Sequence, residues 1–162
     1  MYPGGTFYNS KEIEAVIKVI KAQSPFRFYG PNFLDYSKKF EQEYAKYIGV
    51  RYALAVSSGT AALHVALKAL GVRAGDEVII PAYSWVACPA AVVACGAKPV
   101  IAEIDESLTL DPDDVASKIT DKTKVIMAVH MRGAPANLEK LQKIAKENNI
   151  FLLEDCSQAV GG

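Results

Sequence analysis

The chain has 162 residues, of which 51% are hydrophobic and 22% are charged, a composition typical of an ordinary soluble domain. Its 18 basic residues balance its 18 acidic residues, and the lysines are scattered, so we expect no nucleic-acid partner. The three cysteines, Cys88, Cys95 and Cys156, match the spacing of neither a zinc site nor a redox pair. We therefore expect reduced thiols and no metal site.

Neither a leader nor a membrane span is predicted. The N-terminal segment Met1–Gly5 lacks a basic region followed by an apolar stretch. The apolar run Val78–Ile80 is far too short to cross a bilayer. We therefore expect a cytoplasmic protein without a membrane partner.

Two amphipathic helices are predicted in the first third of the chain. The first covers residues 10–22, where Asn9 and the glutamate three residues later have the spacing of a capping box. A stretch with proline and glycine over residues 24–31 interrupts the pattern, and a second helix follows and ends at Gly49. Together they form an N-terminal helical arm over about residues 1–49.

After this arm, short apolar runs alternate with helical segments. The predicted strands are Tyr52–Val56, Glu77–Ile80, Pro99–Ile104, Lys124–Val129 and Ile150–Leu153. The predicted helices lie near residues 60–70, 84–95, 112–118 and 136–148, the third with Asp111 as its cap and Pro112 at its first position. This order favours an α/β fold of three layers (α/β/α), with a mostly parallel sheet covered on both faces.

The first strand is followed by Ser57-Ser58-Gly59-Thr60, which opens a helix. In an open α/β sheet, ligands lie beyond the carboxyl ends of the strands. Glycine allows the backbone to approach a ligand closely, and the free amides and the dipole of the helix favour a phosphate group. The same residues also fit an ordinary strand-to-helix turn with a threonine near the N-cap.

Trp85, the only tryptophan, follows the second strand. Its flat face can stack on a planar heteroaromatic ring, which adds about 0.5–1.5 kcal/mol to simple burial. The alternative interpretation is a tryptophan of the core.

The last strand ends in Glu154-Asp155, with Gln158 three residues later. A carboxylate at this edge can hold a protonated ring nitrogen of pyridine type, and the amide of Gln158 can reach an oxygen on the same ring. One of the acids could instead cap the next helix or bind magnesium. His130 and Arg132 follow the strand that ends at Val129, so we expect them to face the site and contact substrate.

The chain from Tyr29 onward resembles a known family, and five motifs carry the resemblance. They are Ser58–His64, Gly75–Pro81, Gly96–Val100, Val129–Gly133 and Glu154–Ala159. In this order and spacing they resemble the DegT/DnrJ/EryC1/StrS family of sugar aminotransferases. The resemblance implies that residues 1–162 form the N-terminal part of an aspartate-aminotransferase type I large domain, incomplete here. It also implies an active site shared between two subunits of a homodimer.

The resemblance implies pyridoxal 5'-phosphate as the cofactor. Carried over by position, it assigns Gly59 and Thr60 to the cofactor phosphate, Trp85 to stacking on the ring, Asp155 to the ring nitrogen and Gln158 to the ring oxygen. Tyr29 resembles a family segment that lies near the partner subunit's site and contacts substrate, although an ordinary turn explains it equally well.

The activity implied is transfer of an amino group, with glutamate as the donor, to a keto-sugar used in sugar or polysaccharide biosynthesis. The sugar is linked to a nucleotide or, as the form His130-Met131-Arg132-Gly133 suggests, of octulosonate type. The family's Schiff-base lysine normally follows the Asp-x-x-Gln segment, and this sequence reaches Gly162 without one. The catalytic lysine is therefore unassigned, and we expect it from a companion chain or from further sequence. The alternatives are an inactive fragment, a regulatory or binding protein of the same fold, and a deoxysugar dehydratase that uses the same cofactor.

Overall fold

The computed structural model describes residues 7–161, so the segment Met1–Gly5, in which no leader is expected, lies outside the described residues. The chain divides into two compact units, of which the first runs to Ala55 and the second begins at Val56. Within residues 7–161, no helix combines the length and the apolar character that a membrane crossing requires.

The first unit contains the two helices predicted for the arm. Helix α1 covers Ser10–Lys21 and helix α2 covers Tyr36–Ile48. The predicted capping box is confirmed, because the side chain of Asn9 accepts the N–H of Lys11 at 3.0 Å and the Glu12 carboxylate accepts the N–H of Asn9 at 2.7 Å. Helix α2 ends at Gly49, whose φ of 79° is one that glycine adopts without strain.

The predicted strand Tyr52–Val56 is wrong, since this segment is irregular and pairs with no strand among residues 7–161. At Ala55, side chains satisfy the backbone instead. The N–H of Ala55 donates to the carboxylate of Glu41 at 2.6 Å, and its carbonyl accepts a hydrogen bond from Arg27 at 3.3 Å. Arg27 also pairs with Glu41. Both backbone groups of Ala55 are therefore already hydrogen-bonded without a strand partner.

The second unit is built on a four-stranded parallel sheet in the order β2-β1-β3-β4. Its strands are β1 (Glu77–Pro81), β2 (Lys98–Ala102), β3 (Thr123–Val129) and β4 (Phe151–Asp155). Strand β2 ends before the predicted Ile104, which forms an isolated antiparallel bridge with Leu110. Strand β4 continues past the predicted end and includes both acids of its motif.

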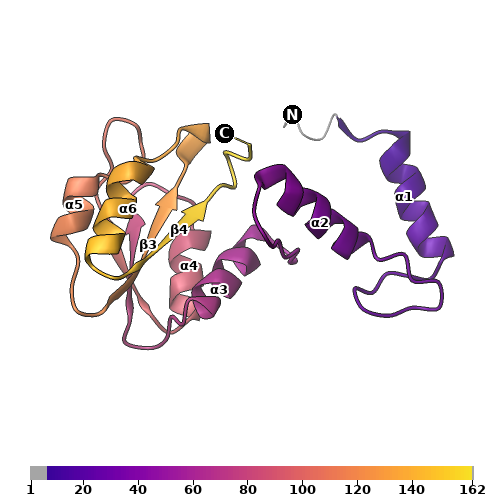
Figure 1. Cartoon of the computed structure of the whole chain (residues 1–162), viewed down its shortest axis with the longest axis horizontal. Helices are drawn as coiled ribbons and strands as arrows, with labels where there is room; N and C mark the ends of the chain where they lie inside the picture. The colour runs from indigo at the N-terminus through magenta and orange to yellow at the C-terminus, as the bar shows by residue number, and fades with distance from the viewer. Residues whose placement is uncertain (1–6, 162) are drawn as a thin grey trace. The chain divides into compact units, whose positions relative to one another are not determined.

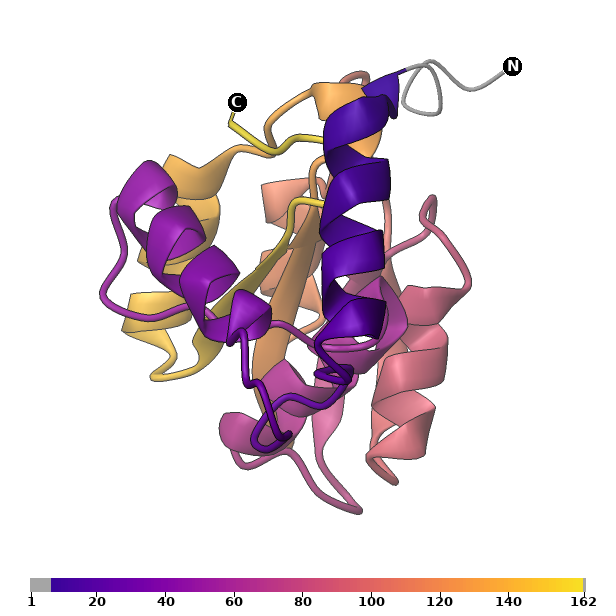
Figure 2. The same cartoon turned by 90° about the vertical axis from the view of Figure 1, so that its right-hand side faces the viewer.

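Helices cover both faces of this sheet, which confirms the predicted three layers (Figure 1; Figure 2 gives the view turned by 90°). Helices α3 (Gly59–Ala69) and α4 (Ala87–Ala94) pack on one face, and α5 (Pro112–Ser117) and α6 (Leu138–Glu147) pack on the other. As predicted, Asp111 caps α5, where its side chain accepts the N–H of Asp113 at 2.9 Å.

The side chains of the central strands alternate between the two faces. Val78 and Ile80 of β1 pack with the α3 and α4 layer, whereas Ile79 packs with the α5 and α6 layer. In β3, Met127 packs with the α3 and α4 layer, and Ile126 packs with the α5 and α6 layer. Each of these side chains is at most 2% exposed, and such burial is worth about 1.5–3 kcal/mol per side chain. This alternation fixes the register of the sheet, because a slip of one residue would reverse every face.

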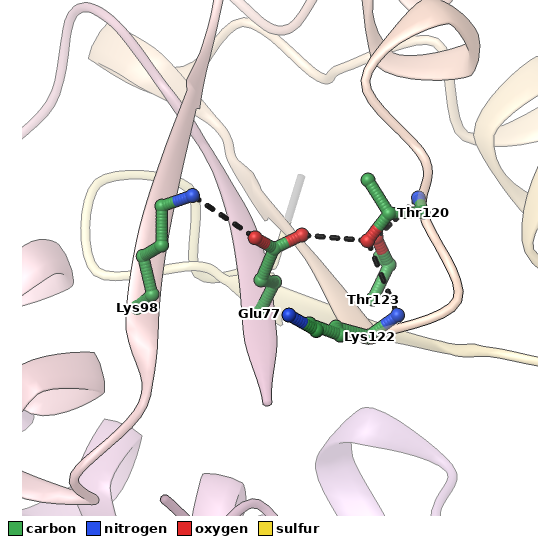
Figure 3. A network of polar contacts seen from close by, with 5 residues as sticks. All are labelled: Glu77, Lys98, Thr120, Lys122 and Thr123. Carbon is green, nitrogen blue, oxygen red and sulfur yellow. Dashed lines mark hydrogen bonds and ion pairs between the residues drawn. The ribbon is translucent and has the colours of Figure 1, made fainter. Parts of the chain in front are cut away.

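A polar network around Glu77 closes the amino-terminal edge of the sheet (Figure 3). Its carboxylate accepts the hydroxyl of Thr120 at 2.7 Å and pairs with the ammonium group of Lys98 at 3.0 Å. The N–H of Glu77 donates to the carbonyl of Lys122 at 2.8 Å, and the N–H of Thr120 donates to the Thr123 hydroxyl at 2.9 Å. One buried carboxylate thus joins the starts of β1 and β2 to the turn before β3.

We expect Glu77→Gln to lower the free energy of unfolding by about 1–2 kcal/mol at neutral pH, because the charge-assisted bonds to Thr120 and Lys98 are weakened. The Thr120 hydrogen bond and then Lys98 lower the pKa of Glu77 from its ordinary 4.5. The advantage of the wild type is therefore complete above that value and disappears as the pH falls through the lowered pKa. Urea unfolding at several pH values measures this difference.

The matched control is Glu147→Gln, which removes an exposed ion pair with Lys143 at 3.9 Å. We expect this substitution to change the free energy of unfolding by less than about 0.5 kcal/mol. Equal losses in the two variants, or an advantage of Glu77 that grows in acid, would contradict the role of the network.

Candidate functional site

The candidate site lies where the connections of the sheet diverge. Strand β1 leads through α4 to β2 on one side, and β3 leads through α6 to β4 on the other. Ligands of open α/β sheets bind at such a switch point, beyond the carboxyl ends of the strands. A cavity of about 230 Å³ lies there, and all five residues predicted to bind the cofactor line it. The lining residues are Gly59, Thr60, Leu63, Trp85, Ala87, Val129, Met131, Asp155, Ser157 and Gln158.

The N-terminus of α3 forms one side of the cavity. Ser58 is the N-cap, and its hydroxyl accepts the N–H of Ala61 at 3.1 Å. Gly59 and Thr60 are the first two residues of the helix, whose opening amides have no partner within the helix. A Cβ atom added at Gly59 would lie 3.9 Å from the Ser157 hydroxyl, which also lines the cavity. Glycine therefore keeps space free beside amides that can bind an anion.

Trp85 stands between the end of β1 and the start of α4 and is 72% exposed. The interpretation of Trp85 as a core residue is therefore wrong. Its side chain borders the cavity and retains a large free aromatic surface. This arrangement suits stacking on a planar ring inside the cavity.

Asp155 ends β4 and is 9% exposed. Its Oδ1 atom accepts the N–H of Ser157 at 3.0 Å and also the Ser157 hydroxyl. Its Oδ2 atom lies 3.6 Å from the Sγ atom of Cys88. The carboxylate is thus held from both sides at the wall of the cavity. Because neighbouring residues of a strand point to opposite faces, Glu154 lies on the other side of the sheet.

Gln158 is held at the rim by the 3₁₀ turn Met131–Gly133. Its side-chain oxygen accepts the N–H of Arg132 at 2.6 Å, so its NH₂ group remains the donor available to a ligand. Arg132 has a φ of 54° and an exposed side chain. Its backbone positions Gln158, whereas its side chain is not part of the cavity lining.

His130 does not face the cavity, contrary to the expectation from its place after β3. The residue is 4% exposed, and its Nδ1 atom accepts the N–H of Ala136 at 3.0 Å. In the neutral ring the hydrogen is then on Nε2, which donates to the Glu154 carboxylate at 3.1 Å. Both ring nitrogens are therefore hydrogen-bonded within the protein. The side chain of His130 points to the face opposite that of Val129, and Val129 is the residue that lines the cavity.

Cys156 completes a cluster with His130 and Glu154, whose ligand-type atoms lie within 4.8 Å of one another. Metal-binding histidines normally donate their second ring N–H to an acceptor, whereas this ring accepts a hydrogen bond at Nδ1. Although Cys156 is exposed, partial desolvation of its thiol, followed by the charges of Glu154 and Asp155, raises the pKa of that thiol. The geometry therefore favours a hydrogen-bonded pair beside a neutral thiol over a metal centre.

Tyr29 belongs to the first unit, where its ring stacks on that of Phe26 at 4.7 Å between centroids and remains 65% exposed. Two contacts of the site were missed in the sequence. Ser157 follows Asp155 by two residues, the spacing of a local side-chain turn, and this signal was available. Cys88 carries no such signal, since only the tertiary structure brings the start of α4 close to Asp155 at the end of β4.

Comparison with known sequences relates residues 8–162 to the model of the DegT/DnrJ/EryC1/StrS aminotransferase family. The chain is 46% identical over 127 residues to GDP-perosamine synthase of Vibrio cholerae, covering 78% of this chain and 35% of the relative. It is also 46% identical over 125 residues to L-glutamine:2-deoxy-scyllo-inosose aminotransferase of Streptomyces kanamyceticus, covering 76% of this chain and 29% of the relative. The chain thus spans about a third of the length of these relatives.

Solved structures share the fold. 3-Amino-5-hydroxybenzoic acid synthase matches with a TM-score of 0.89 and 37% identity over 94% of this chain and 39% of its own. NtdA of Bacillus subtilis, solved with bound PMP, matches with a TM-score of 0.85 and 34% identity, covering 92% of this chain and 33% of its own. GDP-4-keto-6-deoxy-D-mannose-3-dehydratase of E. coli, solved with hydrated PLP, matches with a TM-score of 0.79 and 30% identity, covering 92% of this chain and 39% of its own. With a family model that matches all but its first seven residues, the chain belongs to the DegT/DnrJ/EryC1/StrS aminotransferase family.

Proposed function

We propose that this chain is the cofactor-binding part of a pyridoxal 5'-phosphate-dependent aminotransferase that acts on a keto-sugar. One observation carries the proposal: Gly59, Thr60, Trp85, Asp155 and Gln158 line a single cavity at the switch point of the sheet. These residues come from three separate segments of the chain. Their side chains and amides offer an anion site, an aromatic face, a carboxylate and an amide donor, the groups that a phosphorylated pyridine ring needs.

Each residue has a distinct task in this proposal. The amides at the start of α3 and the hydroxyl of Thr60 bind the phosphate, and Trp85 orients the ring by stacking. Asp155 holds a proton on the ring nitrogen, and Gln158 donates to the ring oxygen. The bound cofactor supplies an electron sink that stabilises negative charge on the substrate carbon bearing nitrogen.

The substrate is a keto-sugar, linked to a nucleotide or of octulosonate type. A nucleotide-linked sugar has the support of the 46% identity to a GDP-perosamine synthase. We propose glutamate as the amino donor. Glutamine is the competing donor, because it appears in the name of the Streptomyces kanamyceticus relative. The catalytic lysine comes from a companion chain or from further sequence, in a cytoplasmic assembly that is a homodimer or includes that companion.

A dehydratase is the second candidate, because the E. coli dehydratase shares this fold at 30% identity. Both reactions are tested on the assembly that contains this chain, with GDP-4-keto-6-deoxymannose, PLP and ¹⁵N-labelled glutamate or glutamine. Mass spectrometry of the sugar product separates the outcomes. A gain of ¹⁵N identifies an aminotransferase and its donor, loss of a sugar oxygen without nitrogen identifies a dehydratase, and an unchanged sugar supports a binding or regulatory protein.

We expect pyridoxamine phosphate to quench the fluorescence of Trp85, the only tryptophan, in a saturable way. This ligand carries no aldehyde, so surface lysines do not react with it. Asp155→Asn should weaken its binding about 10- to 100-fold, because a charge-assisted hydrogen bond worth about 1.5–3 kcal/mol is lost. The control is Glu154→Gln, which neutralises the adjacent carboxylate on the opposite face and should leave binding unchanged. Absence of saturable quenching in the wild type would contradict cofactor binding.

Gly59→Ala should separate binding from stability. The added Cβ would lie 3.9 Å from the Ser157 hydroxyl, which is an ordinary van der Waals contact, so we expect the fold to be retained. Alanine stabilises helices relative to glycine, so the free energy of unfolding should stay equal or rise by up to about 1 kcal/mol. The methyl group occupies space beside the α3 amides, so binding of pyridoxamine phosphate should weaken at least tenfold. Unchanged binding with unchanged stability would place the phosphate elsewhere.

A further inference from the structure

Cys88 is the one cysteine that touches a proposed cofactor-binding side chain. It is the second residue of α4 and is fully buried, and its Sγ atom lies 3.6 Å from the Oδ2 atom of Asp155. Its N–H donates to the carbonyl of Trp85 at 3.0 Å. The same residue thus contacts both the carboxylate and the backbone of the aromatic residue that border the cavity.

The direction of the contact between Cys88 and Asp155 follows from their chemistry. Burial, followed by smaller contributions that include the nearby charge of Asp155, raises the pKa of the Cys88 thiol to about 11. The thiol therefore keeps its hydrogen at neutral pH. An ionised carboxylate only accepts hydrogen bonds, so the S–H group donates to Oδ2. Ser157 donates to Oδ1, and the two donors hold the carboxylate from both sides.

We infer that Cys88 is a positioning residue, whose thiol holds the Asp155 carboxylate in the orientation in which it can accept a hydrogen bond from the protonated ring nitrogen. The inference rests on the proposed function. A carboxylate that lost this donor would be less well held and would retain the ring proton less effectively. Buried donors to a charged group act in this way because the charge has little water to solvate it.

The other cysteines have different surroundings. Cys95, at the C-cap of the same helix, is 7% exposed and packs in the apolar core beside α3. Cys156 is exposed and lies with His130 and Glu154 on the opposite face. Cys95 therefore offers a matched control for the loss of a buried thiol that has no contact with Asp155.

The first arm of the test needs no cofactor. In a chain with Cys95→Ala and Cys156→Ser, the infrared S–H stretching band reports Cys88 alone. We expect this band at the lowered frequency of a bonded thiol, and we expect Asp155→Ala to return it to the frequency of a free thiol. Glu154→Ala should leave the band in place. A band that does not respond to Asp155→Ala would overturn the inference whether or not the chain binds a cofactor.

The second arm compares Cys88→Thr with Cys88→Val, two side chains of similar shape that differ in one hydroxyl donor. Binding of pyridoxamine phosphate labelled with ¹⁵N in its ring is measured by Trp85 fluorescence, and the ring nitrogen is followed by NMR. We expect the threonine variant to match the wild type. The valine variant should bind about fivefold more weakly and show a ring-nitrogen shift displaced toward the neutral form.

A purely structural role of Cys88 predicts a different pattern. Thermal unfolding of Cys88→Val and Cys95→Ala would then change while the ring-nitrogen shift stayed at its wild-type position. Equal affinity and equal shift in the threonine and valine variants would overturn the role of Cys88 and leave cofactor binding intact. Failure of the wild type to bind pyridoxamine phosphate would overturn both proposals.

Discussion

Burial of the parallel sheet on both faces is the constraint on which the rest of the structure depends. The central strands β1 and β3 send alternate side chains into two separate cores, one under α3 and α4 and one under α5 and α6. Because neither strand can slip by one residue without exposing both sets, the carboxyl ends of the strands have fixed positions. The loops that follow the strands therefore start from defined positions, and so do the side chains that line the cavity.

The two ends of the sheet serve different purposes. At the amino-terminal edge, Glu77 joins three segments through a hydroxyl, an ammonium group and a backbone carbonyl, and its contacts are satisfied within the protein. At the carboxyl edge, some groups around the cavity remain available to a ligand. Gln158 has its oxygen engaged and its NH₂ group available, and Trp85 keeps a free face. The polar groups of the amino-terminal edge are thus satisfied within the protein, whereas the carboxyl edge keeps groups that can bind a ligand.

Periodicity predicted most of the fold, because helices and buried strands leave local patterns in the sequence. The strand predicted at Tyr52–Val56 failed, since the pattern carries no information on whether a partner strand is present, and Glu41 and Arg27 satisfy Ala55 instead. The five cofactor residues were placed together because strand ends converge. The prediction that His130 faces the cavity was wrong, because alternation along the strand directs its side chain to the opposite face. The contact of Cys88 with Asp155 depends on tertiary packing that local spacing does not encode.

The adjacent acids at the end of β4 also restrict how this chain can vary in length. Asp155 borders the cavity and Glu154 pairs with His130 on the far side, so the two carboxylates have separate environments despite being consecutive. Deleting or inserting a single residue within β4 would exchange them, and the cavity would receive a glutamate without its thiol and hydroxyl donors. A change of two residues would preserve the parity. A single-residue change in this strand would therefore alter the lining of the cavity, whereas loops away from the site are free of this constraint.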